Sequence, residues 1–110
     1  MNQLTSCRLL ALLVLAAALP STACAEDVST LYKSKCAVCH APDGSGRKAM
    51  SGTNLLAESA RKRSDNELAE AIAKGGPRNN DAHAYEKKGI SADQVKLLVG
   101  YIRELQKKTQ

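Results

Sequence analysis

The chain has 110 residues, with 16 Lys and Arg against 11 Asp and Glu and a formal net charge of +5. This length leaves room for one small domain, and a hydrophobic core without any Phe or Trp is thin. The basic residues are spread along the chain in short groups, which argues against nucleic-acid binding.

The first 25 residues are predicted to be a signal peptide that directs export of the protein. Arg8 precedes an unbroken apolar run over residues 9–19, which is too short to span a bilayer. Ala23-Cys24-Ala25 matches the A-x-A cleavage pattern, so Glu26 is expected to begin the mature chain. A cut before Cys24 would instead give a lipidated N-terminus, although Ser21 differs from the apolar residue that such sites usually carry.

Residues 26–110 form the predicted mature domain, which has 85 residues. Only Arg8 leaves with the signal peptide, so this domain keeps 15 basic residues against 11 acidic ones, a net charge of +4. No segment of the domain is predicted to span a membrane. Cys36 and Cys39 are its two cysteines.

Cys36, Cys39 and His40 form a C-x-x-C-H motif, the pattern of covalent haem attachment. Two thiols at this spacing can add to the two vinyl groups on one edge of a porphyrin, while the next imidazole reaches the iron. A redox dithiol remains an alternative, as does a zinc site completed by His83. A disulfide between neighbours this close would close almost no loop and stabilise little.

A first helix is predicted over residues 27–38, because its apolar side chains recur every three to four positions. Tyr32 then lies one turn before Cys36, either near the haem edge or at a helix crossing. Residues 42–46, Pro-Asp-Gly-Ser-Gly, form a turn that ends the helix just after His40.

A loop is predicted over residues 47–63, with the Leu55-Leu56 pair in a short helix. Ser64 and Glu67 then form an S-x-x-E capping box, which begins a second helix. Residues 74–77, Lys-Gly-Gly-Pro, end that helix.

Residues 78–89 have no apolar periodicity and are predicted to be a loop that carries His83 and Tyr85. The last helix is predicted to begin at Ser91, with Gln94 as its capping-box partner. Its expected core face consists of Val95, Leu98, Val99, Ile102 and Leu105. Gly100 within it predicts a close crossing with another helix.

The basic residues of the mature domain fall into four short groups. These are Lys33 with Lys35, Arg47-Lys48, Arg61-Lys62-Arg63 and Lys87-Lys88. Each group alone is typical of a solvated surface. Together they predict a positive rim that docks onto an acidic patch of a partner protein.

Three segments together resemble the small soluble class I c-type cytochromes of bacteria. They are Cys36-Ala-Val-Cys-His followed by Ala-Pro-Asp-Gly-Ser-Gly, then residues 64–75, then residues 90–103, and the resemblance extends over nearly all of residues 27–106. It implies an all-α class I cytochrome c fold, with three to four short helices around one covalent haem c. It also implies a periplasmic one-electron carrier between redox partner proteins. The sequence shows no nucleophile–base pair that would indicate an enzyme.

The resemblance also implies roles for individual residues. Cys36 and Cys39 would attach the haem, and His40 would be the proximal iron ligand. The other ring nitrogen of His40 would meet a backbone carbonyl within residues 52–55. The first and last helices would cross where Tyr32 meets Tyr101.

The resemblance does not extend to the second axial ligand of the iron. Family members usually place a ligating Met before a Pro-Ala-Tyr-like segment, whereas this chain has Asp-Ala-His-Ala-Tyr at residues 81–85. Alignment on Tyr85 puts Ala82 at the Met position, so His83 needs a shift of one residue. An extra residue within 86–89 would allow that shift.

Three assignments of the second ligand remain. His83 would give a bis-imidazole carrier with a lower potential than a Met-ligated relative. A site left open, or filled by water or a nearby Lys, would suit a gas-binding sensor or a weak peroxidase. Met50, the one Met of the mature domain, would reach the iron only after rearrangement.

Overall fold

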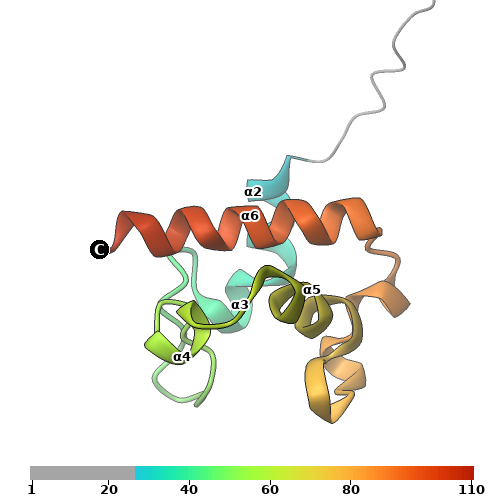
Figure 1. The fold of residues 1–110 in the computed structure, drawn as a ribbon, viewed down its shortest axis with the longest axis horizontal. Coiled ribbons are helices and arrows are strands. Elements are labelled where there is room, and N and C mark those ends of the chain that lie inside the picture. The colour runs from blue at the N-terminus through green and yellow to red at the C-terminus, as the bar shows by residue number, and fades with distance from the viewer. Residues whose placement is uncertain (1–26) are drawn as a thin grey trace, which may run out of the picture.

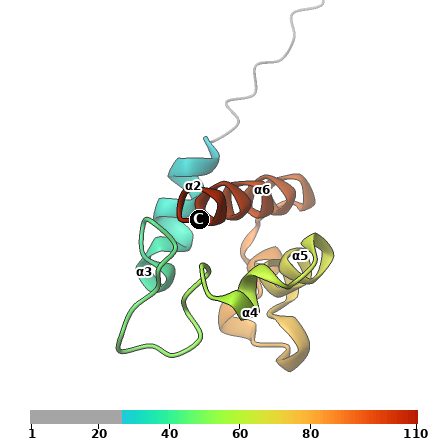
Figure 2. The ribbon, with the colours of Figure 1, turned by 60° about the vertical axis from the view of Figure 1, so that its left-hand side comes forward.

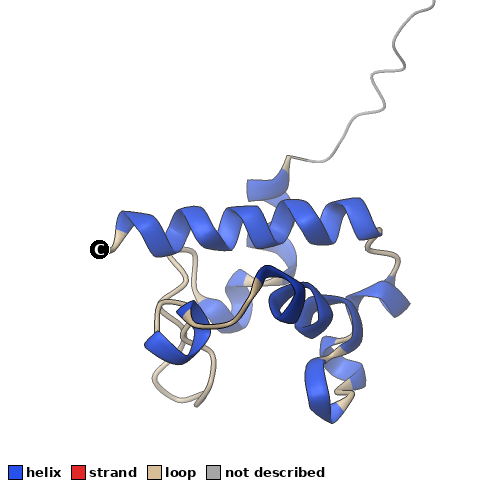
Figure 3. Cartoon of the chain, in the orientation of Figure 1, coloured by secondary structure: helices blue, strands red, loops and turns tan. Residues whose placement is uncertain are grey.

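The computed structural model describes residues 27–110. The predicted signal peptide, its cleavage site and the alternative lipidation at Cys24 lie outside this range. The described part contains five α-helices, three short 3-10 helices and no β-strand, which confirms the predicted all-α class (Figure 3). Within it, no helix is long and apolar enough to cross a membrane.

The predicted first helix is divided at Cys36. α2 spans Val28–Lys35 and α3 spans Ala37–His40, and Cys36 between them has φ −112° and ψ −40°. Its amide still donates to the Tyr32 carbonyl at 2.8 Å, so the backbone bends without losing this bond. One continuous helix over residues 27–38 was therefore a wrong prediction, although the helical stretch does end at His40.

Tyr32 joins α2 to the last helix, α6, which spans Ala92–Lys108 and crosses α2 (Figures 1 and 2). The Tyr32 side chain is completely buried, and its ring centre lies 4.9 Å from that of Tyr101. Its hydroxyl donates to the Ala41 carbonyl at 2.8 Å, and burial raises its pKa, so the phenol keeps its proton. The predicted Tyr32–Tyr101 crossing is confirmed.

Both predicted capping boxes are formed. α5 spans Asp65–Lys74, and the Ser64 hydroxyl accepts from the Glu67 amide at 3.2 Å while the Glu67 carboxylate accepts from the Ser64 amide at 2.7 Å. Ser91 and Gln94 make the same pair of bonds at the start of α6. These bonds satisfy amides that would otherwise lack partners at the two helix starts.

The predicted apolar face of α6 forms much of the core. Its five residues are buried together with Leu31, Tyr32, Leu68, Ile72 and Ile90. Gly100 is exposed, and a Cβ atom added there would meet nothing within 4 Å. The predicted close crossing at Gly100 was wrong, because the register that buries Val99 and Ile102 turns Gly100 towards solvent.

The remaining elements are short and lie on the side of α6 that faces the core. α4 spans Glu58–Arg61, just after the Leu55-Leu56 pair that was expected to be helical. The predicted loop over residues 78–89 is mostly 3-10 helix: η1 is Gly76–Arg78, η2 is Asp81–His83 and η3 is Tyr85–Lys88. Figure 1 shows α4 and these 3-10 helices at opposite ends of the layer that contains α3 and α5.

Candidate functional site

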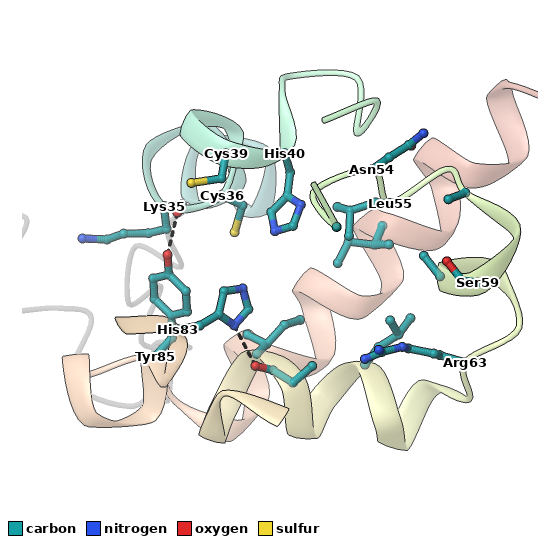
Figure 4. Close-up of a pocket in the computed structure, with 17 residues that line it drawn as sticks. Lys35, Cys36, Cys39, His40, Asn54, Leu55, Ser59, Arg63, His83 and Tyr85 are labelled. Atoms are coloured by element: carbon teal, nitrogen blue, oxygen red, sulfur yellow. Dashed lines mark hydrogen bonds between the residues drawn. The ribbon is translucent and has the colours of Figure 1, made fainter. Parts of the chain in front are cut away.

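A cavity of about 450 Å³ lies between α3, α5, α6 and residues 52–63, a size typical of pockets that hold cofactors. Its lining includes all four residues predicted to bind the haem, namely Cys36, Cys39, His40 and His83 (Figure 4). Most of its remaining wall is apolar, and none of the described Asp or Glu residues lines it.

His40 is held by a carbonyl of residues 52–55, as the family resemblance implied. Its Nδ1 donates to the Thr53 carbonyl at 2.6 Å. A carbonyl oxygen only accepts, so Nδ1 carries the hydrogen and Nε2 keeps its lone pair. Burial lowers the pKa of His40, although the bond to Thr53 opposes this, and nearby His83 lowers it further. The ring is therefore neutral at pH 7, as a metal ligand must be.

The loop that carries Thr53 is fixed against α3. The Arg47 guanidinium donates to the carbonyls of Ala37 and Val38, at 3.2 Å each. The Thr53 hydroxyl accepts from the Arg47 amide at 3.0 Å and donates to the Met50 carbonyl at 2.7 Å. Met50 itself is 45% exposed and does not line the cavity, so its thioether would have to move to reach the cavity.

His83 enters the cavity from the opposite wall. Its Nδ1 donates to the Ala71 carbonyl of α5 at 2.8 Å, which leaves Nε2 with its lone pair. Its neighbour Tyr85 packs against the His83 ring, with ring centres 5.4 Å apart, and donates from its hydroxyl to the Lys35 carbonyl at 2.8 Å. The role of Ala71 could not be predicted, because a backbone carbonyl leaves no signature in the sequence.

The two imidazoles are spaced as a pair of ligands on opposite sides of one metal ion would be. Their ring centres lie 6.1 Å apart and their planes are at 85° to each other. A metal–imidazole bond is about 2.0 Å, and a five-membered ring with bonds of about 1.33 Å has its centre about 1.1 Å from each atom. Two ligands on opposite sides of one ion would therefore have ring centres about 6.2 Å apart. Both rings project into the cavity, His40 from α3 and His83 from below (Figure 4).

The two thiols fit haem attachment better than the alternatives. Cys36 and Cys39 are free thiols, and burial, followed by the influence of Cys39, raises the pKa of Cys36 to about 11. A reactive dithiol requires a lowered pKa instead. Among residues 27–110, no three His, Cys, Asp or Glu side chains are gathered so that they could hold one metal ion. The four proposed zinc ligands are therefore not assembled, whereas a haem iron takes only two ligands from the chain.

The cavity wall formed by residues 54–63 is tied to the last helix. The Arg61 side chain donates to the Leu56 carbonyl at 2.7 Å and to the Gln106 carbonyl at 2.6 Å. The buried Gln106 amide donates to the Leu55 carbonyl at 2.8 Å. This segment therefore keeps its position although it contains only one turn of α-helix.

The four basic groups have different surroundings. The guanidinium groups of Arg47 and Arg61 are used for bonds within the fold. Lys35 lines the cavity beside the cysteines. The Lys88 ammonium lies 4.7 Å from the centre of the Tyr85 ring and donates to the Ala82 carbonyl.

A sequence model of the cytochrome c family matches residues 25–106 of the chain. That range contains both cysteines and both histidines of the cavity. No curated protein and no solved structure matches the chain significantly.

Proposed function

Because this chain belongs to the cytochrome c family, whose members carry covalent haem c, we propose that it is an exported one-electron carrier with His40 and His83 as axial ligands. Cys36 and Cys39 would form the two thioether bonds. When bound, the haem iron supplies a one-electron ferric–ferrous couple.

The observation that carries the axial assignment is the pair of imidazoles 6.1 Å apart. Each ring is held by a hydrogen bond from its Nδ1 to a backbone carbonyl, and its Nε2 points into the same cavity. A hydrogen bond at the ring nitrogen that does not bind the metal orients an imidazole ligand and makes it more basic. Two ligands held in this way would be in position before an electron arrives, which would favour transfer with little rearrangement.

Two imidazoles favour the ferric state more than an imidazole and a thioether do. We therefore expect a lower reduction potential than that of a relative with an axial Met. Because both axial positions would be occupied, the proposal also predicts that small gases bind slowly.

Carbon monoxide binding to the ferrous protein tests this assignment. The wild type should bind slowly, whereas H83A, which removes the second imidazole, should bind as soon as the two are mixed. M50L is the matched control and should behave as the wild type does. Fast binding by the wild type would contradict the proposal and favour the gas-binding alternative. A changed ferric absorption or magnetic resonance spectrum in M50L would assign the ligand to Met50.

The edge of the cavity beside the cysteines is the proposed docking surface for redox partners. Lys35 and Lys88 both contact Tyr85, Lys35 through its backbone carbonyl and Lys88 through its ammonium, and the exposed Val38 lies between the two cysteines in the chain. Positive charge around a small apolar contact favours a partner with an acidic patch.

Export to the periplasm is proposed from the leader sequence. Mass spectrometry of the haem-stained protein from a bacterial periplasm should give a chain that begins at Glu26 and carries one haem. A chain that retains residues 1–25, or a lipid on Cys24, would contradict this assignment.

A further inference from the structure

The Tyr85 side chain connects the two walls of the cavity at their edge. Its hydroxyl donates at 2.8 Å to the carbonyl of Lys35, the residue directly before Cys36. Its ring packs edge-on against the His83 ring, with ring centres 5.4 Å apart and planes at 81°. Figure 4 shows the side chain reaching from the His83 wall to Lys35, beside the two cysteines. One side chain therefore links the cysteine-bearing wall to the candidate second ligand.

The Tyr85 ring is also held at its backbone and at its face. Ala84, which joins it to His83, is buried, and the Tyr85 carbonyl accepts at 3.1 Å from the amide of Ile90, which is buried as well. The Lys88 ammonium lies over the ring, 4.7 Å from its centre, where a cation is attracted to the π-electrons. The ring is thus a fixed surface against which a neighbouring side chain can rest.

The His83 ring needs such a surface. Within residues 27–110 its side chain makes one hydrogen bond, from Nδ1 to the Ala71 carbonyl at 2.8 Å. Its own element, η2, has three residues, and the other two, Asp81 and Ala82, are exposed. One hydrogen bond fixes the position of one ring atom but lets the ring turn about it. Contact with the Tyr85 ring restricts that turn and keeps Nε2 directed into the cavity.

We propose that Tyr85 is a positioning residue for the second axial ligand: by joining Lys35 to His83, it slows the departure of the His83 ring from the iron. This inference rests on the proposed function, in which His83 is that ligand. It requires the hydroxyl of Tyr85 as well as the ring, because the hydroxyl attaches the ring to the cysteine-bearing wall. A phenylalanine would keep the ring contact and lose the attachment.

Carbon monoxide binding to the ferrous holoprotein tests the proposal, because the gas binds only after His83 has left the iron. Y85F should bind carbon monoxide about fivefold faster than the wild type, the factor that corresponds to one hydrogen bond of average net strength. Y85L also removes the ring contact and should bind faster than Y85F. Stopped-flow mixing measures these rates, and a Y85F rate equal to that of the wild type would overturn the proposal.

Tyr32 provides the matched control. Its hydroxyl also donates to a backbone carbonyl at 2.8 Å, that of Ala41, but it contacts the other wall of the cavity. Y32F therefore loses an equivalent bond and should keep the wild-type rate of carbon monoxide binding. Y101F removes a hydroxyl that makes no hydrogen bond within residues 27–110 and should also keep that rate. A general loosening of the fold would speed Y32F as much as Y85F, and that result would overturn the proposal.

A second measurement covers the case in which Y85F does not accumulate. In NMR spectra of the ferrous wild type, the Tyr85 ring hydrogens should show cross-relaxation with the His83 ring and with a backbone hydrogen of Lys35 or Cys36. The absence of either contact would overturn the proposal.

The wild type alone separates this inference from the proposed function. A colourless band in a haem-stained gel, or carbon monoxide binding as soon as the wild type is mixed with the gas, would contradict the proposed function. Slow binding by the wild type together with an unchanged rate in Y85F would overturn only the role of Tyr85.

Discussion

The two walls of the cavity each present one imidazole, but the chain builds them in different ways. His40 ends a helix that directly follows the cysteines, and the loop with its Thr53 partner is fixed to that helix by Arg47. His83 lies in a 3-10 helix and depends on α5 through Ala71. The comparison shows that a contiguous motif can position one ligand, while the other depends on packing between separate elements.

The largest expected effect comes from removing the two imidazoles one at a time. H40A should lose most of its haem-stained protein, because the ligand next to the tether is removed. H83A should keep its covalent haem, since the cysteines and the first ligand remain. Yield is measured by haem staining against total protein on the same gel. Equal losses in both variants would show that the two walls contribute equally to the holoprotein.

Replacing one glycine in each wall should destabilise that wall alone. Gly46 in the His40 wall and Gly75 in the His83 wall both have positive φ. A Cβ at Gly46 would lie 2.7 Å from the Asn54 amide nitrogen, and one at Gly75 would lie 2.3 Å from the Asn80 carbonyl oxygen. An alanine at positive φ costs about 1 to 2 kcal/mol through its backbone conformation alone. G46A and G75A should therefore lower the free energy of unfolding by more than this amount.

Two other glycines provide the controls for this experiment. Gly52 has φ +79° and Gly89 has φ +89°, but a Cβ at either would meet nothing within 4 Å. In denaturant unfolding, G52A and G89A should therefore lower the free energy of unfolding only by the conformational cost of about 1 to 2 kcal/mol. If all four variants lost the same stability, the close contacts at Gly46 and Gly75 would not matter.

The difference between the walls also explains what the sequence could predict. Cys36, Cys39 and His40 were predicted as haem-binding residues because they form one contiguous motif, whereas a carbonyl within residues 52–55 as the partner of His40 was implied only by the family resemblance. The capping boxes at Ser64 and Ser91 were likewise predicted from short contiguous motifs. The cavity position of Arg63 was missed, because an arginine in a basic cluster looks like a solvated side chain until the fold shows its surroundings.

The smallest expected effect concerns the start of α5, which carries the Ala71 carbonyl. S64A and S91A each remove one capping box and should each lower the free energy of unfolding by about 1 kcal/mol. Only S64A should also speed carbon monoxide binding, because α5 holds His83 and α6 holds neither ring. Stopped-flow mixing of the ferrous variants measures this rate. Equal rates in the two variants would show that His83 does not depend on the start of α5.

The bonds from Arg61 and Gln106 between the cavity wall and the last helix have a consequence for local unfolding. The Gln106 side chain binds the carbonyl of Leu55, which lies 51 residues earlier in the chain. Fraying of the last turns of α6 would therefore also release one wall of the cavity and admit water to it, although those turns contribute little to the cavity lining themselves.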